Sequence, residues 1–178
     1  SFKNSELTNL ILKKSGYSRY EISNFSLPGH QSRHNRVYWS GSGWWSFGQG
    51  STSSPWGRKL TRPRISKEYK EWVIKQCEEK LDPSLVNQDN FYKELDEQIM
   101  LGMRLKEGIN IYNLINEQNW DEKKSEINLK KLLKEWERYL ESGLLINKGN
   151  RFFLSDPKGM ELSNQILISM FKWWEEIN

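Results

Sequence analysis

Cysteine is nearly absent from the sequence, which has one, Cys77, among its 178 residues. One cysteine excludes an internal disulfide, and it also excludes an iron–sulfur cluster or a multi-thiolate zinc site built by this chain alone. The scarcity of cysteine indicates a reducing compartment. Cys77 falls on the apolar face of a helix expected from Ser66 onward, which favours a buried small side chain over a reactive thiol.

Long apolar runs are missing as well. The sequence contains no run of about 18 apolar residues that would span a membrane. Its first residues lack the apolar stretch of roughly 7–15 residues that a signal peptide needs. The chain begins with Ser1 rather than Met, and we therefore expect it to be part of a longer protein.

The composition is lean in aliphatic residues and rich in rings. Hydrophobic residues make up 36% and aromatic residues 13% of the chain, so aromatic side chains must supply much of the buried area. The net charge is +4, from 27 basic and 23 acidic residues. Because the two signs are interspersed, they indicate a mixed solvated surface rather than a dedicated nucleic-acid face.

Both histidines, His30 and His34, lie in a segment from Tyr20 to Ser54 that is rich in aromatic residues and glycine. Six glycine and proline residues exclude one long helix here. We predict a strand, a loop that carries polar and aromatic groups, and a second strand. Functional side chains often lie on such loops.

Before this loop, the pattern predicts a helix over residues 5–14, a glycine turn at Gly16 and a strand over 17–25. Helix, turn and strand form one step of a parallel α/β sheet. Glu21 and its polar neighbours then lie near the carboxyl end of the strand. They either face a ligand there or satisfy loop backbone, and the pattern leaves both interpretations open.

A short helix over residues 31–39 would place His30 and His34 on one face. Zinc binding by this pair lacks a third ligand. Haem ligation is an alternative, with the rings of Tyr38 and Trp39 covering a porphyrin. A local hydrogen-bonding role for His34, with the rings in the core, is the third, and the spacing alone favours it.

Two features follow this helix. We expect a short buried strand over residues 44–47 and a glycine-rich stretch from Gly48 to Ser54, where a ligand could approach the backbone closely. The stretch fits neither the Walker A pattern nor GxGxxG. We place a domain boundary near residues 80–90, where Asp82-Pro83 interrupts the pattern.

The second half predicts helices over residues 92–106, 109–118 and 121–142, a hairpin over 144–154, and a final helix that Asp156 caps and Pro157 opens. This order is typical of winged-helix-like domains. The hairpin carries only Lys148 and Arg151, whereas phosphate binding needs a clustered basic face. The pattern therefore favours an interaction or lid domain.

The segments YEISNF, PG and RHNRVYW within residues 20–39 resemble the HemW-type haem chaperones. These are radical S-adenosylmethionine proteins once grouped with oxygen-independent coproporphyrinogen III oxidase. HNRVYW fits the HNxxYW signature that marks the chaperones and is lacking in the oxidase. LGMRLKEGI at 101–109 and the later GLLI resemble the C-terminal domain of the family.

The resemblance implies specific roles. His34 would ligate haem iron, with Asn35, Tyr38 and Trp39 as haem contacts. A propionate would pair with Arg33 or Arg36. In the family, the region that corresponds to Gly48–Ser54 approaches S-adenosylmethionine, which makes the following residues candidates: Gly48, Gly50, Ser51 and Ser54. The family's CxxxCxxC cluster motif is absent from this chain, so its [4Fe–4S] ligands match no residue here.

The resemblance also implies an α/β plus mostly α fold. Residues 1–64 would form the end of a partial β/α radical S-adenosylmethionine barrel. Residues 65–90 would form a connecting helix and linker, and residues 91–178 would form a winged-helix-like domain. A homodimer is a candidate assembly, and the cytoplasm is the expected location, with peripheral contact to a membrane as an alternative.

The function expected from this resemblance is that of a haem chaperone fragment. It would have no enzymatic activity of its own, because the cluster and S-adenosylmethionine belong to the full-length protein. The intact protein would deliver haem to haem proteins, with respiratory or membrane-associated proteins as candidate recipients. Two alternatives remain, coproporphyrinogen oxidation in porphyrin biosynthesis and a winged-helix nucleic-acid-binding module, although we expect no nucleic-acid partner.

Overall fold

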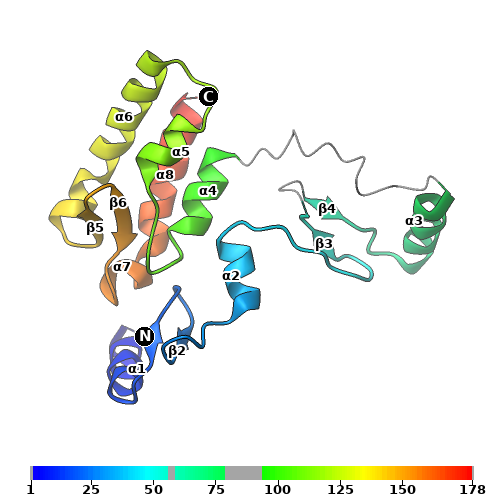
Figure 1. Cartoon of the computed structure of the whole chain (residues 1–178), viewed down its shortest axis with the longest axis horizontal. Coiled ribbons are helices and arrows are strands. Elements are labelled where there is room, and N and C mark those ends of the chain that lie inside the picture. The colour runs from blue at the N-terminus through cyan, green and yellow to red at the C-terminus, as the bar shows by residue number, and fades with distance from the viewer. Residues whose placement is uncertain (1, 56–58, 79–93, 178) are drawn as a thin grey trace. The chain divides into compact units, whose positions relative to one another are not determined.

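The computed structural model describes residues 2–55, 59–78 and 94–177. Contacts divide the chain into two units (Figure 1). The first unit comprises residues 1–39 and 94–178, and the second comprises residues 40–93. This grouping differs from a linear division at residues 64 and 90, because the N-terminal segment packs with the C-terminal half. The boundary predicted near residues 80–90 lies outside the described residues.

The C-terminal half has the element order predicted from the sequence, with shorter helices. The elements are α4 (Leu95–Gly102), α5 (Ile111–Asn116), α6 (Glu122–Glu141), β5 (Leu145–Lys148), β6 (Arg151–Leu154), α7 (Lys158–Glu161) and α8 (Ser163–Ile177). Side chains fix two helix starts: Asp121 Oδ1 accepts from the Lys124 backbone N–H at 2.7 Å, and Asn110 caps α5 in the same way.

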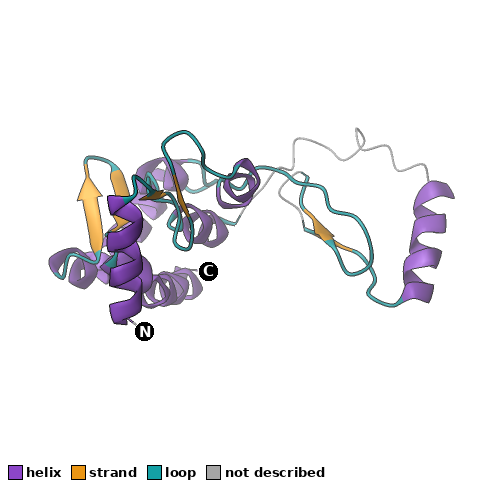
Figure 2. Ribbon diagram, turned by 90° about the horizontal axis from the view of Figure 1, so that it is seen from below, coloured by secondary structure: helices purple, strands orange, loops and turns teal. Residues whose placement is uncertain are grey.

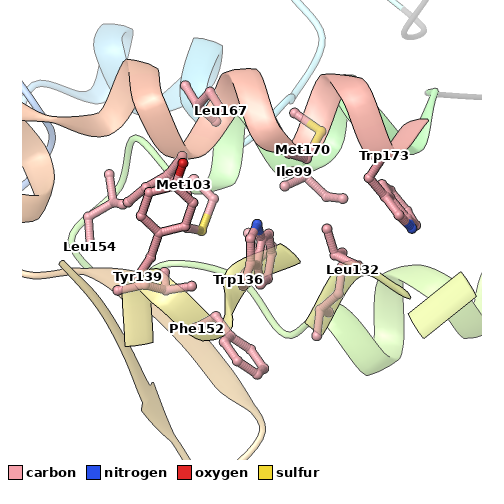
Figure 3. Packing of buried hydrophobic residues seen from close by; sticks show 14 of the residues in the cluster. Ile99, Met103, Leu132, Trp136, Tyr139, Phe152, Leu154, Leu167, Met170 and Trp173 are labelled. Carbon is pink, nitrogen blue, oxygen red and sulfur yellow. The ribbon is translucent and has the colours of Figure 1, made fainter. Parts of the chain in front are cut away.

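The core of the first unit lies between α6, α8, α4 and the hairpin. Figure 3 shows Leu132, Trp136 and Tyr139 of α6 turned toward α8, at the i, i+4, i+7 spacing of one helix face. The Trp136 and Phe152 rings lie 5.5 Å apart. Trp173 Nε1 donates to the Asn128 carbonyl at 3.0 Å. Aromatic rings therefore supply much of this core, as the composition indicates.

The predicted cap of the last helix is wrong. The helix is interrupted at Leu162, which separates α7 from α8, and α7 has no side-chain cap. The Asp156 carboxylate instead forms ion pairs with Arg19 Nε at 3.1 Å and Lys13 Nζ at 3.3 Å, and it accepts a hydrogen bond from Asn9. Arg19 is buried, and a buried cation needs a counter-charge. That need outweighs local capping.

The N-terminal segment forms α1 (Phe2–Lys14), β1 (Ser18–Arg19) and β2 (Phe25–Ser26). The helix is where the pattern predicts it, but the strand folds back on itself, since β1 and β2 pair antiparallel. Glu21 also bridges antiparallel to Leu105, beside hydrogen bonds from the backbone N–H of Ile22 and Lys106. Within the described residues every strand pair is antiparallel, in short ladders (Figure 2).

The second unit contains β3 (Thr52–Ser53), β4 (Leu60–Thr61) and α3 (Ser66–Glu78). The buried strand predicted over residues 44–47 is wrong, because Trp45 is exposed and Phe47 is 86% exposed. Helix α3 starts where predicted but has no buried residue, so Cys77 is exposed rather than buried. Among the described residues, no helix is long and apolar enough to cross a membrane.

Candidate functional site

Helix α2 (Arg33–Trp39) carries the HNRVYW motif, and the residues just before it set where it begins. Gly29 adopts a φ of 77° in the turn before it, a conformation that glycine tolerates best. The Ser32 hydroxyl then accepts from the Asn35 backbone N–H at 3.3 Å, in the manner of an N-cap. The short helix predicted over residues 31–39 is thus present over Arg33–Trp39, with a defined start.

The two histidines do not form a metal pair on one helix face. His30 precedes α2, and its Nδ1 lies 2.9 Å from the Pro28 carbonyl oxygen. In the described part of the chain, no group of three or more His, Cys, Asp or Glu side chains is placed to hold a metal ion. The structure therefore gives the zinc interpretation no support.

His34 is exposed, and its ring meets that of Tyr38 one helical turn later. The two rings pack edge to face, with centroids 5.0 Å apart and planes at 81°, a favourable arrangement for aromatic rings. An exposed imidazole beside a half-buried ring can be reached by a flat ligand. These two side chains therefore leave the His34 imidazole accessible to a ligand from solvent.

Asn35 points to a different partner. Its Nδ2 donates to the Tyr20 hydroxyl at 3.3 Å, and Tyr20 is buried. The backbone carbonyl of Tyr20 accepts from the Lys106 N–H at 3.0 Å. Asn35 thus joins α2 to the segment that bridges to residues 104–106, and its amide nitrogen is directed to Tyr20 rather than to His34.

Trp39 lies against Arg104, whose guanidinium carbon is 4.3 Å from the ring centroid. This is a cation–π contact. Trp39 Nε1 and Arg104 Nε are both buried and have no hydrogen-bond partner among the described residues. The structure therefore gives Trp39 an anchoring contact in the segment just after α4, which the sequence did not indicate.

The two candidate propionate partners differ. Arg36 donates from Nη1 to Gln31 Oε1 at 2.7 Å, and its Nη2 forms an ion pair with Glu107. Arg36 therefore already has a carboxylate partner in the first unit. Arg33 is exposed at the start of α2.

Glu21 is completely buried. Its Oε1 accepts from the Ser23 backbone N–H at 2.9 Å and from the Asn24 side chain. For this carboxylate oxygen, these contacts match the interpretation that Glu21 satisfies polar groups of its own loop. The other, Oε2, is buried without a partner among the described residues.

The glycine-rich stretch lies in the second unit, where its groups form hydrogen bonds within the stretch and to other segments of that unit. The Ser51 hydroxyl donates to the Gly48 carbonyl at 2.7 Å, and the Gly50 N–H donates to the Pro63 carbonyl at 3.0 Å. Arg62 Nη1 donates to the Ser51 hydroxyl at 3.1 Å. Ser54 is buried and exchanges two backbone hydrogen bonds with Trp44.

A cavity of about 410 Å³ lies between the β5–β6 hairpin and the segment after α4, and the sequence did not reveal it. Its lining residues are Lys106, Glu107, Lys148, Arg151 and Phe153. The basic residues of the hairpin were visible in the sequence. Their approach to Lys106 was not, because it depends on the non-local pairing of Ile109 with Phe152.

Known proteins similar to this chain over most of its length include heme chaperones. The heme chaperone HemW of Synechocystis sp. is 31% identical over 175 residues, which is 93% of this chain and 42% of that protein. The heme chaperone HemW of Lactococcus lactis is 28% identical over 157 residues, 88% of this chain and 38% of that protein.

A mitochondrial radical S-adenosyl methionine domain-containing protein 1 of Danio rerio is 24% identical over 163 residues, 89% of this chain and 34% of that protein. No family model and no solved structure matches. The chain spans about two fifths of the length of the HemW proteins described above. The chain is thus a relative of the HemW-type haem chaperones, similar to a part of them over nearly all of its own length.

Proposed function

We propose that this chain is the haem-binding part of a HemW-like protein that delivers haem to haem proteins. One observation carries the proposal: His34 of the HNRVYW motif presents an exposed imidazole on a capped helix beside Tyr38. Bound haem would supply an iron centre, and the His34 imidazole would hold it, since a neutral imidazole nitrogen is a common ligand for iron.

The contacts of α2 support a rigid presentation of His34. Asn35 bonds Tyr20, Trp39 packs under Arg104, and Arg36 pairs with Glu107. These contacts hold the helix while the imidazole stays exposed. A ligand that is held in its binding position before the partner arrives loses less conformational entropy on binding. Tyr38 would then limit the orientations that the imidazole ring can adopt.

The architecture that we propose for the intact protein has a partial radical S-adenosylmethionine barrel ending near residue 64, a connection, and a winged-helix-like domain from residue 91. The order α4, α5, α6, β5–β6 and the bridge from Ile109 to Phe152 support the second of these domains. The Gly48–Ser54 stretch stays our candidate for approach to S-adenosylmethionine. Cys77 alone does not fit a [4Fe–4S] cluster, so we assign this chain no catalytic step.

The test is a haem titration followed by Soret absorbance on the wild-type chain and two variants. His34→Ala should weaken binding by more than about tenfold, since loss of an outer-shell partner alone costs roughly 10–100-fold. His30→Ala is the matched control, an exposed histidine four residues away and outside α2. It should bind haem as the wild type does. Equal affinities and spectra for all three proteins would remove His34 from the mechanism.

A further inference from the structure

The basic cavity beside the β5–β6 hairpin is lined by two lysines that form no ion pair among the described residues. Lys106 and Lys148 line it and are exposed. Neither ammonium group has an ion-pair partner within residues 2–55, 59–78 and 94–177. Phe153 adds an apolar wall. The cavity therefore offers positive charge next to an aromatic surface.

The backbone around this cavity is held in place. Ile109 and Phe152 exchange two backbone hydrogen bonds of 2.9 and 2.8 Å. Arg151 donates from Nε to the Glu107 carbonyl at 3.0 Å and from Nη2 to the Gly108 carbonyl at 2.9 Å. Arg151 is thus a positioning residue that ties the segment after α4 to the hairpin.

The charge balance of the cavity favours an anion. Its acidic residue, Glu107, is paired with Arg36 of α2, so its carboxylate does not compensate the two lysines. A carboxylate accepts charge-assisted hydrogen bonds from ammonium groups. The apolar wall favours a carboxylate attached to a flat apolar body over a small free anion.

We propose that Lys106 and Lys148 receive a propionate carboxylate of the tetrapyrrole. This inference rests on the proposed function and deepens it by naming the residues that bind the propionate. The ion pair of Glu107 with Arg36 connects the rim of the cavity to α2, two residues from His34. Arg36, one of the two arginines expected from the sequence, already has a carboxylate partner, so the two unpaired lysines are better placed than Arg36 to supply the charge.

The test compares iron-free protoporphyrin IX, which carries two propionates and cannot use axial ligation, with its dimethyl ester. Binding is followed by porphyrin fluorescence for the wild type and for Lys106→Gln/Lys148→Gln. The double variant should bind the diacid about tenfold more weakly, which corresponds to about 1.4 kcal/mol, and the ester unchanged. The control is Lys131→Gln/Lys134→Gln, with the same charge change at exposed positions of α6, and it should match the wild type.

The outcomes separate the inference from the proposed function. If haem binding depends on His34 but the diacid binds the double variant and the wild type equally, the lysine site is overturned and the function stands. If the wild type binds neither haem nor porphyrin, both are overturned. If a DNA or RNA duplex displaces the diacid from the wild type, and the double variant also binds the ester more weakly, the two lysines form a nucleic-acid site. That result overturns the inference. Unchanged circular dichroism of each variant verifies its fold.

Discussion

The ion pair of Asp156 with Arg19 predicts a large loss of stability on substitution. Asp156→Ala leaves Arg19, whose side chain is 6% exposed, without its counter-charge. Removing one partner of a buried pair costs roughly 3–5 kcal/mol. Because the Asp156 side chain is 13% exposed, we expect the lower end, about 3 kcal/mol, which in a chain of this length corresponds to a fall of roughly 6–12 °C in the midpoint of thermal unfolding.

Urea unfolding followed by tryptophan fluorescence measures this loss. Lys13→Ala is the matched control, since Lys13 contacts the same carboxylate but its side chain is 51% exposed, and an exposed pair contributes about 0–1 kcal/mol. The reasoning is refuted if the free energy of unfolding of Asp156→Ala lies within about 0.5 kcal/mol of the wild type, on the order of the measurement error. It is also refuted if Lys13→Ala lowers the free energy of unfolding as much as Asp156→Ala does. Either result would mean that the N-terminal segment, which leads into α2, is not held by this pair.

Three further predictions follow from contacts of single residues. Gly108→Ala should lower the free energy of unfolding in urea far more than Gly149→Ala. Both glycines have positive φ, but only at Gly108 would a Cβ collide with the hairpin backbone, 2.0 Å from the Phe152 carbonyl oxygen. Equal losses would contradict the packing. The hydrogen bond and charge of Lys130 lower the pKa of Glu126, so Lys130→Ala should raise that pKa in a carboxyl NMR titration. The small stability that the pair adds should be lost as pH falls through the lowered pKa. An unchanged titration would contradict the pair. Exposed Cys77 should react fully with a thiol reagent in the native protein, and reaction only after unfolding would contradict its exposure.

The helices of the C-terminal half could be predicted because their apolar residues recur with helical period and their caps are local. Asp121 lies three positions before Lys124, whose backbone N–H it caps, and the buried residues of α6 recur at every third or fourth position. Such signals need no knowledge of the rest of the chain. The same holds for α2, whose start is set by Ser32.

Two of the errors came from interactions between residues distant in sequence. Residues 17–25 have the composition of one strand, but Glu21 pairs with Leu105, 84 positions later. Asp156 has the sequence of a helix cap, but buried Arg19 recruits it. Neither partner can be identified from local pattern, because each depends on which surfaces the fold brings together.

The candidate site shows the same division. The motif identified His34, Asn35, Tyr38 and Trp39 as a group, and the structure places all four on one short helix. The motif could not show that His34 alone of the four is exposed, or that Asn35 contacts Tyr20 and Trp39 contacts Arg104. Those partners come from other segments of the first unit.

The central claim is that His34 binds haem iron, and the two histidines of the chain allow a direct measurement. In a protein labelled with ¹⁵N-histidine, the imidazole signals of His30 and His34 are assigned with the two alanine variants, and ferric haem is then added. We predict that the His34 signals disappear because that ring coordinates the paramagnetic iron, and that the signals of His30, which does not coordinate it, broaden less. Retention of the His34 signals at saturating haem, or equal loss of both sets, would contradict the account.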